Sequence, residues 1–142
     1  MNRPVRLVTS VELDDVEDPR VQRFSALHDA ELADGRRLTL LDDRGWGGRA
    51  FRSDGRTAHA IEALEAWSFL TREEIEREAR MVVGPDEAFG GHSQEDMEDD
   101  HWAHLADVLR ARGITIEPPE LRRLPHEVVL GERLLAALDR KL

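Results

Sequence analysis

The hydrophobic pattern of this 142-residue chain changes its period once, near residue 57. Before that point apolar and β-branched residues alternate with polar ones, most clearly over residues 5–13, and after it apolar residues recur every three or four positions. A period of two places alternate side chains on one face of a strand, whereas a period near 3.6 gives a helix an apolar face. The chain is therefore expected to be an α+β protein, with an N-terminal antiparallel β meander of about three to four strands packed against three to four C-terminal helices.

Turn signals divide the first part of the chain into strand-like runs. The pair Asp34-Gly35 lies between residues 24–33 and 36–42, and an Asp-Gly pair between two such runs is a strong hairpin signal. A second turn is predicted at residues 44–48 (RGWGG), and another Asp-Gly pair follows at Asp54-Gly55. The first 55 residues are thus expected to form the meander.

The second part of the chain carries helix signals. A helix is predicted over residues 58–70, where apolar residues have helical spacing. Another begins at Thr71, because T-R-E-E can form a capping box, and should end at Gly84-Pro85. After a glycine-rich loop, Ser93 and Asp96 can cap a third helix that reaches residue 112.

The C-terminal region is predicted to add one strand and one helix. Residues 114–117 (ITIE) suit a short strand, Pro118-Pro119 should interrupt it, and residues 128–142 place several leucines on one helical face. Length and composition fit a single globular domain over residues 1–142, which is β-rich over 1–56 and mainly helical over 58–142.

Composition excludes several classes of function. Without cysteine the chain has neither disulfides nor thiolate chemistry. Its first residues do not show the uninterrupted apolar stretch expected of a signal peptide, and no apolar run approaches the roughly 18 residues that span a bilayer. We expect a cytoplasmic protein that does not bind membranes. The sequence pI near 5.0 argues against nucleic-acid binding, and neither the G-x-S-x-G motif of serine hydrolases nor a nucleotide-binding glycine motif is present.

The most unusual feature is an acidic segment between Arg80 and Arg110. It contains eight carboxylates and three histidines but no Lys or Arg, and it accounts for most of the net charge of −10. Such a one-signed stretch indicates either a surface for a cationic partner or a metal site. The carboxylates are Asp86, Glu87, Glu95, Asp96, Glu98, Asp99, Asp100 and Asp107.

The first hypothesis is a non-enzymatic module that binds another, basic protein without a cofactor. Trp46, which lies among glycines and arginines, is a second candidate anchor for that partner. The arrangement is analogous to that of immunity or antitoxin proteins. The predicted binding surface consists of Asp86, Glu87, Glu95, Asp96, Glu98, Asp99, Asp100 and Trp46.

The alternative hypothesis is a metal-dependent enzyme, such as a hydrolase. Asp96, Asp100 and His104 are spaced by four, so they share one ridge of the predicted helix and could bind a divalent metal ion, with His92 or His101 completing the site. The spacing matches neither H-E-x-x-H nor an EF-hand loop.

A third hypothesis is a homo-oligomeric structural module. Residues 36–56 contain six Arg against three Asp, so this stretch of one copy could meet the acidic segment of another. Alternatively, the two stretches compensate each other within one fold. The sequence leaves both arrangements open.

Overall fold

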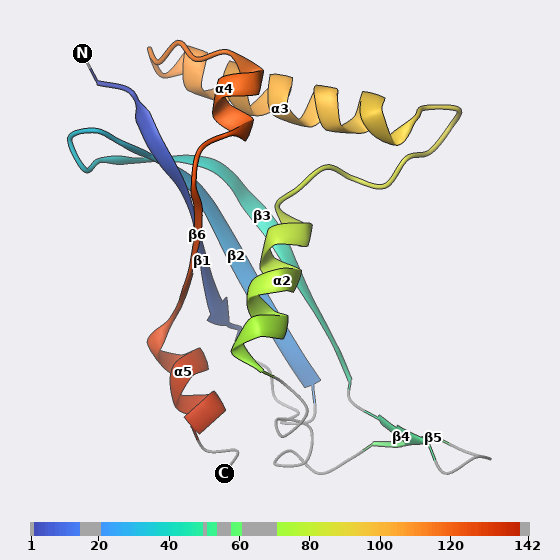
Figure 1. The fold of residues 1–142 in the computed structure, drawn as a ribbon. Helices are drawn as coiled ribbons and strands as arrows, with labels where there is room; N and C mark the ends of the chain where they lie inside the picture. Colours follow the sequence, from blue (N-terminus) through green and yellow to red (C-terminus); the bar gives the residue numbers. More distant parts are fainter. Residues whose placement is uncertain (1, 15–20, 50, 54–57, 61–70, 140–142) are drawn as a thin grey trace.

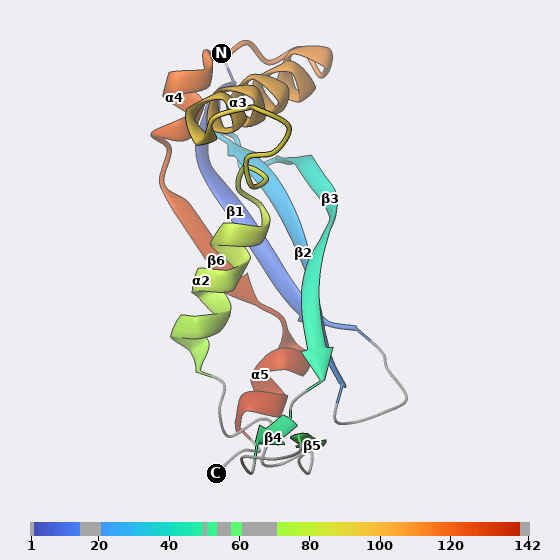
Figure 2. The same cartoon turned by 90° about the vertical axis from the view of Figure 1, so that its right-hand side faces the viewer.

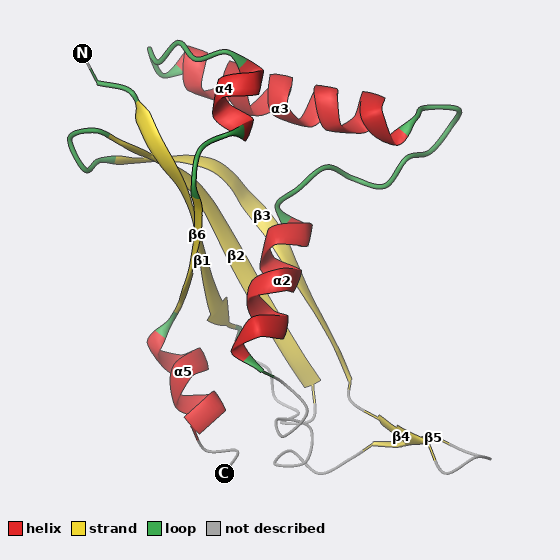
Figure 3. Ribbon diagram, in the orientation of Figure 1, coloured by secondary structure: helices red, strands yellow, loops and turns green. Residues whose placement is uncertain are grey.

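The computed structural model describes residues 2–14, 21–49, 51–53, 58–60 and 71–139, and it confirms the α+β class. Three long strands form an antiparallel meander, and a fourth strand from near the C-terminus pairs in parallel with the first (Figures 1 and 3). The strand order is β3-β2-β1-β6. The strands are β1 (Pro4–Leu13), β2 (Val21–Leu32), β3 (Arg37–Arg49) and β6 (His126–Leu130).

The predicted hairpin at Asp34-Gly35 is confirmed. It joins β2 to β3, and Gly35 has a φ of +91°, a left-handed conformation that strains any residue with a β-carbon. The Asp34 side chain accepts hydrogen bonds from the Arg36 backbone amide (3.0 Å) and guanidinium (2.9 Å). The turn therefore fixes the register of both strands.

The turn predicted at residues 44–48 is wrong, because β3 continues through these residues to Arg49. A β-carbon on Gly45 would lie 2.5 Å from the carbonyl oxygen of Phe24 on β2, so the glycine permits a close approach of two strands. Next to it, the Trp46 ring stacks on the Phe24 ring with centroids 4.9 Å apart.

A second, two-stranded sheet pairs β4 (Phe51–Ser53) with β5 (Ala58–Ala60). The helix predicted over residues 58–70 is therefore wrong for its first three residues, and residues 61–70 lie outside the described part of the chain. The Asp54-Gly55 turn also lies outside it, between the two strands.

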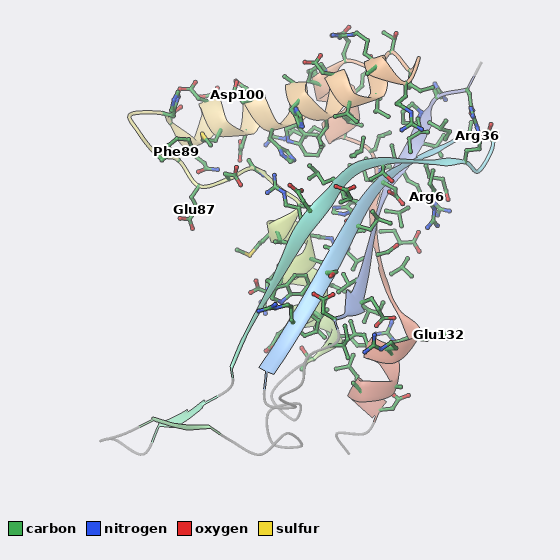
Figure 4. The ribbon with its side chains drawn as sticks, turned by 180° about the vertical axis from the view of Figure 1, so that it is seen from behind. Arg6, Arg36, Glu87, Phe89, Asp100 and Glu132 are labelled. Carbon is green, nitrogen blue, oxygen red and sulfur yellow. The ribbon has the colours of Figure 1, made fainter. Side chains whose placement is uncertain are left out.

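The described helices pack on one face of the four-stranded sheet, α2 and α5 along its length and α3 and α4 across one end (Figures 1 and 2). Two hydrophobic clusters fill the space between: α3 and α4 pack on the first around Leu7, and α2 and α5 pack on the second around Val11. No described helix covers the opposite face, which is seen from behind in Figure 4. The helices are α2 (Arg72–Val82), α3 (Gln94–Ala111), α4 (Pro118–Arg122) and α5 (Glu132–Asp139).

Both predicted helix starts are confirmed. The Thr71 hydroxyl accepts from the Glu74 amide at 3.1 Å, and Ser93 and Asp96 form a full capping box at the start of α3. Helix α3 ends at Ala111 with Arg112 as its C-cap, and the residue after the cap, Gly113, has a φ of +85°. Local side-chain chemistry thus sets these boundaries.

The C-terminal region differs from its prediction. Residues 114–117 form no strand, and Pro118-Pro119 begin α4 rather than interrupt an element, because proline fits the first turn of a helix. The helix predicted over residues 128–142 is confirmed for α5, but its first residues belong to strand β6, and residues 140–142 lie outside the described part of the chain. None of the helices in the described ranges is long and apolar enough to cross a membrane.

Candidate interaction surface

The acidic segment occupies the loop of residues 84–93 and helix α3, with Asp107 in the second half of that helix. In Figure 4, Glu87, Phe89 and Asp100 lie on the opposite side of the molecule from Arg6 and Arg36. Nearly all of its carboxylates are exposed to solvent, and Glu98 is partly buried. Helix α3 has an apolar face: Leu105 and Leu109 are buried in the first hydrophobic cluster, and the half-buried Trp102 packs against it. The helix therefore presents its acidic ridge outward.

Three of the predicted surface carboxylates have structural roles, and one of them, Asp86, pairs with Arg44. Asp96 accepts from the Ser93 amide at 3.4 Å in the capping box, and Glu98 pairs with Arg122 of α4 at 3.2 Å. For Glu87, Glu95, Asp99 and Asp100, by contrast, no ion pair or hydrogen bond is found with any side chain or backbone group in the described ranges. Within the described part of the chain, these four carboxylates therefore present negative charge that no basic side chain neutralises by pairing.

Arg44 joins the Arg-rich stretch to the acidic segment. Its guanidinium donates from β3 to the carbonyl of Val82 at the end of α2 (3.4 Å) and to the carboxylate of Asp86 (3.2 Å). Its side chain is only 26% exposed. The two oppositely charged stretches therefore meet within the fold at this point, while Arg36 and Arg37 pair locally with Asp34 and Glu31.

An exposed aromatic residue lies within the acidic loop. Phe89 is 65% exposed, and its ring makes only an edge contact with the ring of His92, at a centroid distance of 5.7 Å. Gly90 and Gly91 have positive φ angles, and the His92 amide donates to the Phe89 carbonyl at 3.0 Å, so a tight turn presents the ring. The sequence prediction overlooked Phe89, although its position in DEAFGG between acids and glycines was a usable signal.

Trp46 is in a different environment. It is partly buried, packs against both hydrophobic clusters and borders an open groove of about 650 Å³ that Asp42, Asp43 and Arg23 also line. It lies on β3, on the helix-covered face of the sheet beside Phe24. Its contribution to partner binding stays a prediction.

The alternative metal site is not assembled in the described part of the chain. No three His or carboxylate side chains there lie close enough to hold a metal ion. Asp96 takes part in the capping box, Asp100 and His104 are exposed, and His101 is half-buried. Spacing by four residues along a helix therefore did not bring these groups to one point.

A second group of histidines lies in the core, under the helices. The Thr9 hydroxyl is 2.8 Å from Nδ1 of His28 and 2.6 Å from Nε2 of His126. Because a hydroxyl has one proton, it donates to one ring and accepts from the other, and both rings can stay neutral. Burial is the main cause that lowers the pKa of His28 to about 3 and also lowers that of His126.

His101 faces the same region from α3. Its Nε2 atom is buried and finds no hydrogen-bond partner among the described residues. Burial, reinforced by the nearby Arg44 charge, lowers the pKa of His101 to about 4. At neutral pH the core therefore contains uncharged imidazoles beneath the acidic surface.

Comparisons with known proteins do not extend this picture. No protein-family model, no curated protein and no solved structure matches the chain.

Proposed function

We propose that the protein is a non-enzymatic interaction module that binds a basic protein partner through the acidic loop and the start of α3. The observation that supports this most directly is that the exposed ring of Phe89 belongs to the same acidic segment as four carboxylates, those of Glu87, Glu95, Asp99 and Asp100, which have no partner in the described structure. An exposed aromatic side chain in a segment whose charges are all of one sign has the composition of a binding surface.

In this proposal the negative charge raises the association rate, and the exposed apolar area provides the affinity. A dense negative surface raises the rate at which a cationic partner arrives, and salt weakens this effect. Phe89 supplies affinity, because burial of an aromatic ring removes a large apolar area from water. The partner therefore combines Lys or Arg side chains with an apolar pocket.

The surface is also held in place before it binds. Arg44 fixes the loop at Asp86, and the capping box of Ser93 and Asp96 fixes the start of α3. A preorganised loop loses less conformational entropy on binding than a mobile one. This favours a binding role over a purely solubilising one for the carboxylates.

The test neutralises the four unpaired carboxylates together, as Glu87→Gln, Glu95→Gln, Asp99→Asn and Asp100→Asn. A synthetic amphipathic helix of lysine and leucine serves as the basic probe, and its association rate is measured by stopped flow from low to high salt. At low salt we expect association to slow by about tenfold or more, with little change at high salt.

A matched control removes four exposed charges elsewhere, by changing Glu73, Glu78, Glu117 and Glu132 to Gln. If both variants slow association equally, net charge alone is responsible and the proposed surface is wrong. An unchanged rate for the first variant would also reject it. Capture of partners from a lysate at low salt, with native protein and both variants in parallel, would then identify the physiological ligand.

A further inference from the structure

A groove of about 610 Å³ runs between α3 and α4, beside the acidic surface. The half-buried indole of Trp102 and two prolines of the first turn of α4 provide its apolar lining, and three charged side chains complete it. The lining residues are Asp99, Trp102, Pro118, Pro119, Arg122 and Arg123.

The charges of the groove are incompletely satisfied. Arg122 pairs with Glu98 at 3.2 Å, but Arg123 forms no ion pair with another described residue, and neither does Asp99. An apolar slot with a guanidinium that has no ion pair in the described structure suits a ligand that combines an aromatic ring with a carboxylate.

The chain itself displays such a ligand. Phe89 is exposed at the tip of the acidic loop, and Glu87, two residues away, has a carboxylate unpaired among the described residues (Figure 4). Phe89 would fit against Trp102 and the prolines, and Glu87 would pair with Arg123. The ring of His92, in contact with Phe89, offers an N–H group for Asp99.

The loop is tied down in a way that opposes insertion into its own groove. Arg44 holds Asp86 against β3, and the capping box fixes Ser93 to α3, so the chain on both sides of Phe89 is anchored. Figure 1 shows the loop beyond the first residues of α3, while α4 crosses farther along that helix. A second copy can reach the groove without breaking either anchor.

We infer that two copies of the chain associate with Phe89 of each copy seated in the α3–α4 groove of the other. Each chain carries one loop and one groove, and a reciprocal exchange makes both contacts at once and closes a twofold dimer. The interface is small, and we expect a dissociation constant on the order of 10–100 µM. This goes beyond the proposed function, because it requires no foreign partner.

The first experiment is sedimentation analysis of the purified chain over a wide range of concentrations. We expect a reversible monomer–dimer equilibrium that Phe89→Ala weakens by about tenfold or more. Met81→Ala is the matched control, because Met81 is also 65% exposed but takes no part in the proposed contact. Circular dichroism establishes that each variant is folded.

Charge reversal then tests the pairing itself. Glu87→Arg and Arg123→Glu should each weaken the dimer, while an equimolar mixture should associate as well as the native chain. In the mixed dimer the two substituted side chains meet at one contact with opposite charges, and the native pair of Glu87 and Arg123 remains at the other. A mixture that stays as weak as either variant overturns the inference.

A chain that is monomeric throughout, or a dimer that Phe89→Ala leaves unchanged, also overturns it. If the chain is monomeric, its binding to a synthetic peptide of residues 84–93 is measured next. Binding of this peptide that is abolished by Arg123→Glu would assign the groove to an aromatic and acidic segment of a foreign protein. None of these outcomes decides whether the proposed function is correct, because the test of that function measures the rate of association with a basic probe.

Discussion

The carboxylate of Glu12, on β1, occupies the space that a β-carbon on Gly131 would need. Gly131 lies between β6 and α5, and its carbonyl accepts the first hydrogen bond of α5, from Leu135 at 3.0 Å. A glycine at this position has no side chain to cap the helix. Glu12 replaces that cap, accepting from the amides of Arg133 (3.3 Å) and Leu134 (2.9 Å).

Gly131→Ala should lower the free energy of unfolding by about 1 kcal/mol, because the new methyl group displaces the Glu12 cap. The urea midpoint measures this. Glu12→Ala is the control and should cost about 1 kcal/mol by itself. In a chain that already carries Glu12→Ala, Gly131→Ala should lower the free energy of unfolding by much less. If the effects of the two substitutions simply add, the new methyl group does not act by displacing the Glu12 cap.

Thr9→Val should destabilise the core by about 3 kcal/mol. Valine has nearly the shape of threonine, but it leaves the facing nitrogens of His28 and His126 without their hydroxyl partner. Thr9→Ser is the matched control, since it keeps the hydroxyl and removes one methyl group, at a cost of about 1 kcal/mol. Equal destabilisation of the two variants in urea would show that packing, not the hydroxyl, matters.

Stability should fall as the solution is acidified from about pH 6.5 towards pH 4. The pKa values of His28 and His101, about 3 and about 4, lie below the ordinary value of 6.5, so the unfolded chain takes up protons that the native state excludes. This stabilising effect is complete above pH 6.5. Each imidazole contributes a slope of at most about 1.4 kcal/mol per pH unit, and less for the half-buried His101.

His101→Leu should make that pH dependence shallower. At neutral pH it should raise the free energy of unfolding by about 1 kcal/mol, because it removes a buried nitrogen that has no partner in the described structure. Urea unfolding at several pH values measures both effects. His104→Leu, at an exposed position of the same helix, controls for the substitution itself. An unaltered slope in His101→Leu would exclude His101 from the acid response.

Arg44→Gln should loosen the acidic loop with little loss of overall stability. The change removes the donors to Val82 and Asp86, so amide hydrogen exchange over residues 84–92 should accelerate by about tenfold. The global cost should stay near about 1 kcal/mol, since the ion pair is partly exposed. Arg36→Gln removes an exposed turn pair instead and should leave the loop unaffected. If exchange in the loop is unchanged in Arg44→Gln, Arg44 does not anchor it.

The predictions that the structure confirms rest on local chemistry. The Asp34-Gly35 hairpin and the caps at Thr71 and Ser93 each depend on residues within a few positions of one another. The errors arose where distant parts of the chain decide the structure. The glycines of residues 44–48 indicated a turn, but Gly45 is needed because β2 approaches closely.

The features of the candidate site likewise divide into those that local sequence patterns predicted and those that depend on distant parts of the chain. The charge of the acidic segment and the outward ridge of α3 followed from composition and helical period. The Arg44–Asp86 pair and the α3–α4 groove did not, because the pair joins residues 42 positions apart and the groove depends on how two helices pack. Phe89 is a true omission, since its exposure in a glycine-rich loop was open to prediction.

By itself the sequence determined the α+β class, the main hairpin, two helix starts and a strongly acidic segment, because periodicity, turn chemistry and charge act over a few residues. Only the tertiary structure decided that β6 joins the sheet beside β1. That pairing brings His126 to Thr9 across 117 positions of sequence and Gly131 to Glu12. The physical reason is that parallel pairing with a distant strand leaves no local signal, since its partner is chosen by the packing of the whole core.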